Sequence, residues 1–297
     1  MTTLTRLRRR AAAVTRFRPT ARTALAAPGV LLLLGLFAGP LILLILYAFG
    51  TPDFTNVTVK FGWTLENIGR VFDGLYFDAL TRSLLVALGA TVGCFLLGLP
   101  VAYGISRMSG RTQLLLLIAV MVPFWTSFVV RTYSIVNLLG DRGPLADLLT
   151  KLGLVDGQIQ LLYTTPGILI GMIYTYLPLM ILPLFIAFTR ADDTLRAAAS
   201  DLGSTPSRFF FRVALPLARP GIVAGCLLVA IPSAGEFVVP AILGGEKSLM
   251  LGNVISSQFE TVGDYPFGSA LSVTLMVILT VFLVTARSRA MRGTGVA

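Results

Sequence analysis

Apolar residues along this chain gather into six long runs, and short polar segments separate them. The runs lie near residues 27–49, 83–105, 113–135, 163–188, 221–243 and 265–286. About 20 apolar residues, each rising ~1.5 Å along a helix, cross a hydrocarbon core of about 30 Å. Each run therefore predicts one transmembrane helix, and we expect an all-α integral membrane protein with six spans. The third run is the least regular, because Arg131 lies near its end.

The polar segments between the runs are too short to hold a folded domain, which needs at least about 50 residues. We therefore expect a basic tail over residues 1–26, a six-helix membrane domain over 27–288 and a second tail over 289–297. A polar loop at about 190–220 belongs to the membrane domain. The first run is longer than the roughly 7–15 residues of a secretory signal core, which predicts a helix that is retained.

Basic residues are distributed unevenly between the two sides of these spans. Of the 24 lysines and arginines, 17 lie before the first run, after the second, after the fourth and after the sixth. Cytoplasmic segments of membrane proteins carry an excess of lysine and arginine. The asymmetry predicts a multi-pass protein with both termini in the cytoplasm.

The composition agrees with a membrane protein and excludes several classes of function. Hydrophobic residues make up 55% of the chain and charged residues only 13%, whereas soluble domains carry about 25% charged residues. The net charge of +10 is explained by topology, so nucleic acid is not expected as a partner. The chain has no histidine and two cysteines, Cys94 and Cys226, both in apolar runs. Histidine metal sites, serine–histidine triads and a disulfide framework are therefore excluded.

Three short motifs give no catalytic site. In Gly244–Ser248 the sequence GGEKS lacks the adjacent glycine and lysine of a phosphate-binding loop, so this chain is not expected to bind ATP. Ser233 lacks the preceding glycine of a nucleophile elbow. Gly89 and Gly93 have small-xxx-small spacing, which fits either close helix packing within the chain or a dimer face.

The polar loop predicts two short helices joined by a glycine hinge. Asp192 or Asp193 can cap a first helix over 195–202, and Gly203 stands where a left-handed C-cap would lie. Ser204 or Thr205 can cap a second helix that begins at Pro206 and ends at Leu215-Pro216. The first helix has a shallow apolar face, which suits either the lipid surface or a docking partner. The face is formed by Leu195, Ala198, Ala199 and Leu202.

At this loop the chain resembles the binding-protein-dependent ABC importer permeases, whose loop pattern is E-A-A-x3-G-x9-I-x-L-P. Ala197 replaces the glutamate and Val213 the isoleucine, so any salt bridge from that glutamate is absent here. The stretches Val122–Val136, Gly235–Gly245 and Gly252–Ser272 resemble the first permease subunit of the spermidine/putrescine subfamily more than iron, sulfate or phosphonate permeases. The resemblance covers nearly the whole chain.

This resemblance implies a six-helix permease in the bacterial inner membrane, and it implies partners. They are a similar second permease, two copies of a cytosolic ATPase that binds ATP and Mg²⁺, and a periplasmic or lipid-anchored binding protein. The cargo would be a polyamine. The loop would be the coupling helix that docks on the ATPase. The residues carried over to that role are Ala198, Ala199, Asp201, Leu202, Gly203, Val213, Leu215 and Pro216.

Glu236 is the one acidic residue inside the six runs, and Pro232, Gly235 and Pro240 surround it with helix-breaking residues. A charged group at membrane depth usually faces a cavity or a partner. A carboxylate with aromatic faces suits ammonium groups, and Trp125, Tyr133, Tyr174 and Tyr176 lie in other runs. The alternative is that Glu236 caps broken backbone or braces Arg131, and that the aromatic residues belong to the interfacial belt.

Two other functional classes remain open from the residues alone. An ATP-independent cation channel or secondary carrier would also span the membrane, although carriers often show internal repeats and several intramembrane charges. A membrane-embedded enzyme would need a convergent catalytic cluster, and the sequence offers none. An ABC permease for another small solute is the nearest alternative to a polyamine permease.

Overall fold

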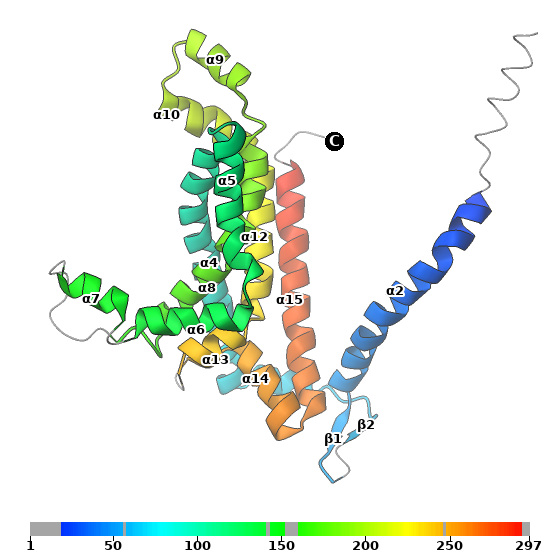
Figure 1. Ribbon diagram of the computed structural model, residues 1–297. Coiled ribbons are helices and arrows are strands. Elements are labelled where there is room, and N and C mark those ends of the chain that lie inside the picture. The colour runs from blue at the N-terminus through cyan, green and yellow to red at the C-terminus, as the bar shows by residue number, and fades with distance from the viewer. Residues whose placement is uncertain (1–18, 56–57, 141–142, 152–159, 246–247, 293–297) are drawn as a thin grey trace, which may run out of the picture.

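The computed structural model describes residues 19–55, 58–140, 143–151, 160–245 and 248–292, and its chain is mostly helical (Figure 1). The predicted tails over 1–26 and 289–297 therefore lie largely outside the described residues. The first part of the chain forms α2 (Pro19–Ala48), β1 (Thr51–Asp53), β2 (Thr58–Lys60), α3 (Glu66–Val71), α4 (Gly74–Ser106), α5 (Gly110–Met121), the 3₁₀ turn η1 (Val122–Trp125), α6 (Phe128–Leu139) and α7 (Pro144–Lys151). The second part forms α8 (Thr165–Phe188), α9 (Asp193–Asp201), α10 (Pro206–Phe209), the π-helical η2 (Phe210–Ala214), α11 (Leu215–Leu217), α12 (Arg219–Ala234), α13 (Val238–Leu243), α14 (Leu251–Ser257), the π-helical η4 (Gln258–Val262) and α15 (Tyr265–Arg292).

Four of the six predicted spans are single long helices. In the described part of the chain, α4, α8 and the apolar portions of α2 and α15 are long and apolar enough to cross a membrane. Two further candidate spans are bent pairs of helices, so the count reaches six if each pair is one span. The all-helical fold class is confirmed, with the addition of a small hairpin.

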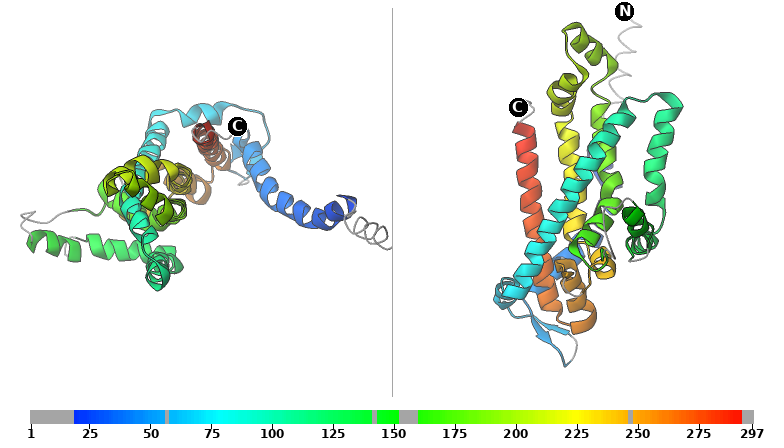
Figure 2. Two further views of the ribbon diagram at one scale, coloured as in Figure 1. Left: turned by 90° about the horizontal axis from the view of Figure 1, so that it is seen from above. Right: turned by 90° about the vertical axis from the view of Figure 1, so that its left-hand side faces the viewer.

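The third predicted span, over 113–135, is not one straight helix. It bends by 96° between α5 with η1 and the segment that begins with α6, so that α6 and α7 run across one end of the bundle (Figures 1 and 2). Pro123 lies in the turn, and the Thr126 amide donates to its carbonyl oxygen over 3.3 Å. A proline cannot donate to a continuing helical ladder, which weakens the helix at this point.

Helices α4, α8 and α12 form the centre of the bundle, and small residues bring them together. A Cβ at Gly221 of α12 would lie 2.3 Å from the Ala187 Cβ and 2.6 Å from the Pro183 carbonyl oxygen of α8. A Cβ at Gly93 of α4 would lie 2.4 Å from Ile173, and one at Gly89 would lie 3.0 Å from Leu169. The small-xxx-small pair is thus used for packing on α8 within the chain.

At the end of the bundle opposite α9, an ion pair joins segments that are distant in the sequence. Arg70 Nη1 of α3 lies 3.1 Å from the buried Asp264 Oδ2, and the guanidinium lies 4.0 Å from the Phe267 ring centroid. Asp264 Oδ1 accepts a hydrogen bond from the Phe267 amide over 3.0 Å. These contacts attach α3 to the first turn of α15.

Strands β1 and β2 form an antiparallel hairpin that the sequence analysis did not predict. Thr51 pairs with Lys60 and Asp53 with Thr58, and Lys60 Nζ lies 3.1 Å from Asp53 Oδ2. The hairpin follows α2 directly and lies near the N-terminal end of α15, at the end of the molecule opposite α9 (Figure 1). Each strand has only three residues, too few to show the alternation of apolar and polar residues by which longer strands are predicted.

Candidate functional site

The polar loop forms the two capped helices that the sequence predicts, and α9 projects beyond the bundle (Figure 1). Asp192 Oδ1 accepts a hydrogen bond from the Leu195 amide over 2.9 Å and caps α9. Thr205 Oγ1 accepts from the Arg208 amide over 3.4 Å and caps α10, where Pro206 occupies the first turn. Of the paired alternatives, Asp192 and Thr205 are the capping residues.

Gly203 forms the predicted hinge between the two helices. Its φ of +73° lies in the left-handed region, and its amide donates to the Ser200 carbonyl oxygen over 2.8 Å. The Ser204 amide donates to the Ala199 carbonyl oxygen over 2.9 Å. These two bonds are those of a Schellman motif, which ends α9 sharply and reverses the chain.

The second helix of the loop continues past its predicted end at Leu215-Pro216. It passes from α10 through a π-helical turn over Phe210–Ala214 into α11, which reaches Leu217. Pro216 lies in α11, inside the helical run that begins at Pro206, so the chain stays helical past this proline. The prediction that Leu215-Pro216 ends this helix was therefore wrong, because the π-helical turn directly before the proline leads into a further helical turn that reaches Leu217.

The residues predicted to couple to an ATPase separate into two groups. Ala198 and Asp201 of α9 and the following Leu202 and Gly203 are exposed, and Leu202 is 89% exposed. Ala199 of α9 is partly buried. The second group is also partly buried and lies on the side of the loop nearest the bundle; it consists of Val213, Leu215 and Pro216. The loop thus presents one exposed helix and attaches the other to the membrane helices.

Glu236 lies in a break between two helices, as its flanking residues predict. Helix α12 ends at Ala234 and α13 begins at Val238. Glu236 is 8% exposed. Its Oε1 accepts from the backbone amides of Phe237, Val238 and Val239 over 3.1, 2.9 and 3.4 Å. The carboxylate therefore covers the amides at the start of α13, a position that also favours negative charge.

The second oxygen of Glu236 accepts a hydrogen bond from the Tyr176 hydroxyl of α8, which is also buried. Both carboxylate oxygens are thus engaged in this conformation. An ion pair with Arg131 is not present within the described residues, although Arg131 is itself only 7% exposed. Its guanidinium lies 5.2 Å from the Phe124 ring centroid and 5.8 Å from that of Phe128.

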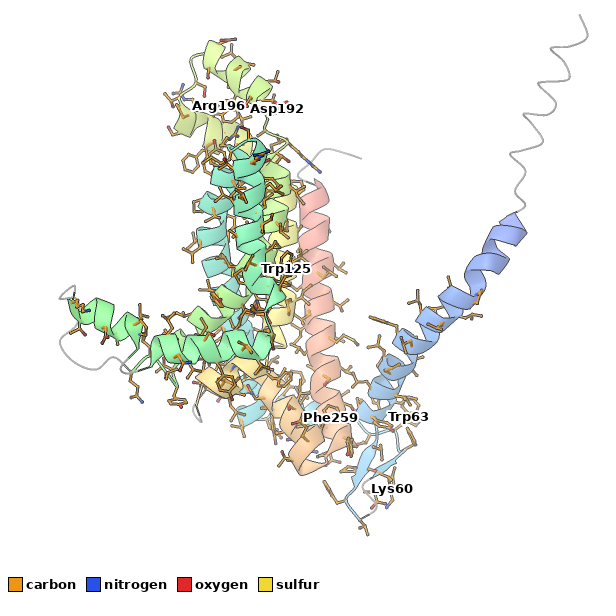
Figure 3. All side chains as sticks on the ribbon, in the orientation of Figure 1. Lys60, Trp63, Trp125, Asp192, Arg196 and Phe259 are labelled. Carbon is orange, nitrogen blue, oxygen red and sulfur yellow. The ribbon has the colours of Figure 1, made fainter. Side chains whose placement is uncertain are left out.

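The other aromatic candidates are exposed rather than gathered around Glu236. Trp125 is 78% exposed at the turn after α5 (Figure 3), Tyr133 is 56% exposed and Tyr174 is 40% exposed. Tyr174 and Tyr176 are two residues apart on one helix, so they face directions about 200° apart. The structure brings Tyr176 to Glu236, and it leaves Trp125, Tyr133 and Tyr174 on open surface.

The described residues contain no group of three metal-ligating side chains. Glu246 and Lys247 of the GGEKS segment lie outside the described residues.

Residues 12–291 match the model of a protein family described as the binding-protein-dependent transport system inner membrane component. The chain belongs to this family. It is therefore a transport permease and a multi-pass protein of the inner membrane, in agreement with the prediction from the polar loop.

Curated relatives of the permease include spermidine/putrescine transport system permeases. It is 41% identical over 225 residues to the protein PotB of Salmonella typhimurium, which covers 76% of this chain and 78% of the relative. It is also 41% identical over 244 residues to PotB of Haemophilus influenzae, covering 82% and 85% of the two chains.

Solved structures support the fold of the permease. A bacterial ABC transporter that imports the acidic polysaccharide alginate aligns with a TM-score of 0.76 over 93% of this chain and 96% of the other, at 17% identity. The MetNI methionine transporter aligns with a TM-score of 0.52 over 73% of this chain. At these identities the likeness concerns the fold alone.

Sequence reasoning missed one group of residues in the permease, at the attachment of the polar loop. The ring centroid of Tyr103 of α4 lies 5.3 Å from that of Phe188 and 4.7 Å from that of Phe210. The Arg107 guanidinium lies 4.8 Å from the Tyr103 ring centroid and 5.6 Å from that of Phe209. The charge distribution uses Arg107 only to indicate orientation, whereas its i,i+4 spacing from Tyr103 at the end of the second run is a sequence signal for this contact.

Proposed function

We propose that this chain is one permease subunit of an ATP-driven importer of polyamines such as spermidine and putrescine. The observation that carries the proposal is the α9–α10 loop, an exposed and capped helix attached by a glycine hinge to the end of a membrane bundle. The 41% identity to spermidine/putrescine permeases supports the substrate class.

The proposed complex contains this chain, a similar second permease subunit, two copies of a cytosolic ATPase and an extracytoplasmic binding protein. The ATPase subunits would bind ATP and Mg²⁺, so this chain needs no nucleotide site. With the α9 end in the cytoplasm, the exposed residues of α9 would contact the ATPase. Closure of the ATPase pair would then move α9 and change the side from which the transport path is open.

Glu236 and Tyr176 are the proposed contacts for substrate ammonium groups on that path. The exposed aromatic side chains of Trp125, Tyr133 and Tyr174 would contribute cation–π faces from the surface that meets the second permease subunit. Since Glu236 is 8% exposed and fully hydrogen-bonded here, substrate contact requires a conformation in which α13 or α8 has shifted.

The test is transport by the complete complex in proteoliposomes. The chain is co-expressed with the second permease subunit and the ATPase of the proposed complex. ATPase activity is then measured in the presence of the binding protein and of one solute at a time: putrescine, spermidine, lysine, magnesium or alginate. Stimulation by polyamines supports the proposal. Stimulation by another solute alone would reassign the substrate, and uptake without a co-purifying ATPase would favour a channel or carrier.

A further inference from the structure

Arg107 occupies the junction between the membrane bundle and the polar loop. It is the C-cap residue of α4, and its side chain is 16% exposed. The two aromatic rings near its guanidinium belong to α4 (Tyr103) and to α10 (Phe209). Its Nη1 lies 3.8 Å from Oδ1 of Asp193, the first residue of α9. One side chain therefore contacts the end of a membrane helix and both helices of the loop.

The hydrogen bonds of this guanidinium are incomplete. Nε and Nη2 are buried and have no hydrogen-bond partner among the residues that the structure describes. These two nitrogens form the side of the guanidinium that can hold a carboxylate with two parallel bonds. A buried donor without a partner is costly, so such atoms in a native protein call for an explanation.

The Asp193 carboxylate lies beside the guanidinium of Arg107 but too far away for a hydrogen bond. A charge-assisted N–H···O bond is about 2.7–2.9 Å long, whereas the Arg107–Asp193 distance is 3.8 Å. The Asp193 side chain is 94% exposed. Asp193 does not cap α9, because Asp192 accepts the capping hydrogen bond from Leu195. The Asp193 carboxylate is therefore available for a closer contact with Arg107.

The two halves of the loop are attached to the bundle to different extents. The second half is held by the Tyr103, Phe188 and Phe210 rings and by the buried Phe209. Helix α9 is exposed along its length except at Ala199, and the Gly203 turn separates it from α10. A displacement of α9 relative to α10 would change the Arg107–Asp193 distance and leave the aromatic contacts in place.

We propose that Arg107 is a positioning residue for energy coupling, and that the Asp193 carboxylate closes onto its Nε–Nη2 edge when α9 is docked on the ATPase. The closed ion pair joins α9 directly to the end of α4. Because α4 packs along α8 and α12, movement of the docked helix then reaches the centre of the bundle. This inference rests on the proposed function, since it requires an ATPase that binds α9.

The test compares uptake and ATP hydrolysis in the reconstituted complex for four variants. Asp193→Asn changes an exposed residue, so the complex is expected to assemble in normal yield. Its uptake per ATP hydrolysed should fall about tenfold, because the neutral amide does not form the bidentate ion pair. Arg107→Gln should show a similar loss, and the double variant Arg107→Gln/Asp193→Asn should be no worse than either single variant. Arg107→Lys keeps the positive charge but cannot hold the carboxylate with two parallel hydrogen bonds, so its uptake per ATP should lie between that of Arg107→Gln and that of the wild type.

Arg111→Gln is the matched control, because Arg111 is an exposed arginine four residues further along that forms no ion pair or cation–π contact with the described residues of the loop. It should leave uptake per ATP unchanged. Wild-type coupling in Asp193→Asn, or additive losses in the double variant, would overturn the inference while wild-type ATP-driven uptake upholds the proposed function. A wild-type complex that lacks ATP-driven uptake would instead overturn the proposed function itself, and this inference with it.

Discussion

Tyr176 donates a hydrogen bond to Glu236 across the interface between α8 and the break that precedes α13. The partners are 60 residues apart in the chain, and both are buried. The pair joins the helix that packs most deeply in the bundle to the point where the fifth span is interrupted. It gives the first prediction, because the cap and the charge of Glu236 can be removed separately.

Glu236→Gln should keep the cap of α13, since the amide oxygen can still accept from the Val238 amide, while the negative charge is lost. If the carboxylate contacts substrate, complex yield should hold and uptake should fall more for spermidine than for putrescine, because the Coulomb energy grows with ligand charge. Glu236→Ala also removes the cap, and its complex should be less stable by about 1 kcal/mol. Uptake of both polyamines, measured with complex yield, distinguishes these outcomes. Unchanged uptake at normal yield for Glu236→Gln would remove this residue from the transport path.

Gly203→Val should uncouple transport from ATP hydrolysis without preventing membrane insertion. A Cβ at Gly203 meets nothing within 4 Å, so the penalty comes from the backbone φ of +73° alone. A β-branched residue in the left-handed region costs roughly 1–2 kcal/mol, enough for about a tenfold loss of the hinged conformation. Gly203→Asn is the control, because asparagine tolerates this conformation. Equal uptake per ATP in the two variants would mean that the hinge angle does not matter for coupling.

Gly221→Ala should destabilise the bundle, because the added methyl group would meet the Pro183 carbonyl oxygen at 2.6 Å and α8 could not approach as closely. Overpacking of this kind costs about 1–3 kcal/mol. Gly35→Ala of α2 is the matched control, since its Cβ would meet nothing within 4 Å. Thermal unfolding of the purified complex in detergent should show a lower midpoint for Gly221→Ala only. A midpoint equal to that of Gly35→Ala would contradict the packing of α12 on α8.

A cysteine at position 204 should react with membrane-impermeant thiol reagents only from the cytoplasmic side, as the distribution of arginines requires. The background is Cys94→Ala/Cys226→Ala, which removes the two native thiols. Thr55→Cys, in the exposed hairpin, should react only from the outside and serves as the control. Labelling of position 204 from outside would reverse the proposed orientation.

The sequence was sufficient for the features that depend on local chemistry. Apolar runs of spanning length located the membrane helices, and Asp192, Gly203, Thr205 and Pro206 predicted the caps and hinge of the polar loop. Gly235 and its neighbouring prolines predicted the break at Glu236. In each case the residues that determine the structure lie within a few positions of it, so the pattern can be read without knowing the rest of the fold.

Contacts between distant segments could not be obtained in this way. The Tyr176 hydroxyl reaches Glu236 because α8 and α12 pack in one particular register, and tyrosines at 174 and 176 look equivalent in the sequence. The 96° bend after Trp125 is likewise not determined by Pro123 alone, since α4 and α8 contain prolines and continue as single helices. The two short strands of the hairpin depend on the hydrogen bonds between β1 and β2 rather than on a pattern within either strand. The assignment of roles to Trp125, Tyr133 and Tyr174 stays a prediction.

The exposure of most of α2, which contacts α15 but buries no residue of its apolar window, has a consequence for how the protein is made. Its apolar window has no residue buried within the chain, whereas half of the window of α8 is buried against neighbouring helices. Helix α2 can therefore enter the lipid as soon as it leaves the ribosome. Helix α8, which packs on both α4 and α12, lacks part of its contact surface until α12 has been synthesised. Before α12 is made, the nascent chain is already anchored by α2, while the contact between α8 and α12 at the centre of the bundle has not yet formed. Mutations that loosen α12 should then yield a protein that is inserted but unassembled, and membrane proteases rather than cytosolic ones would remove it.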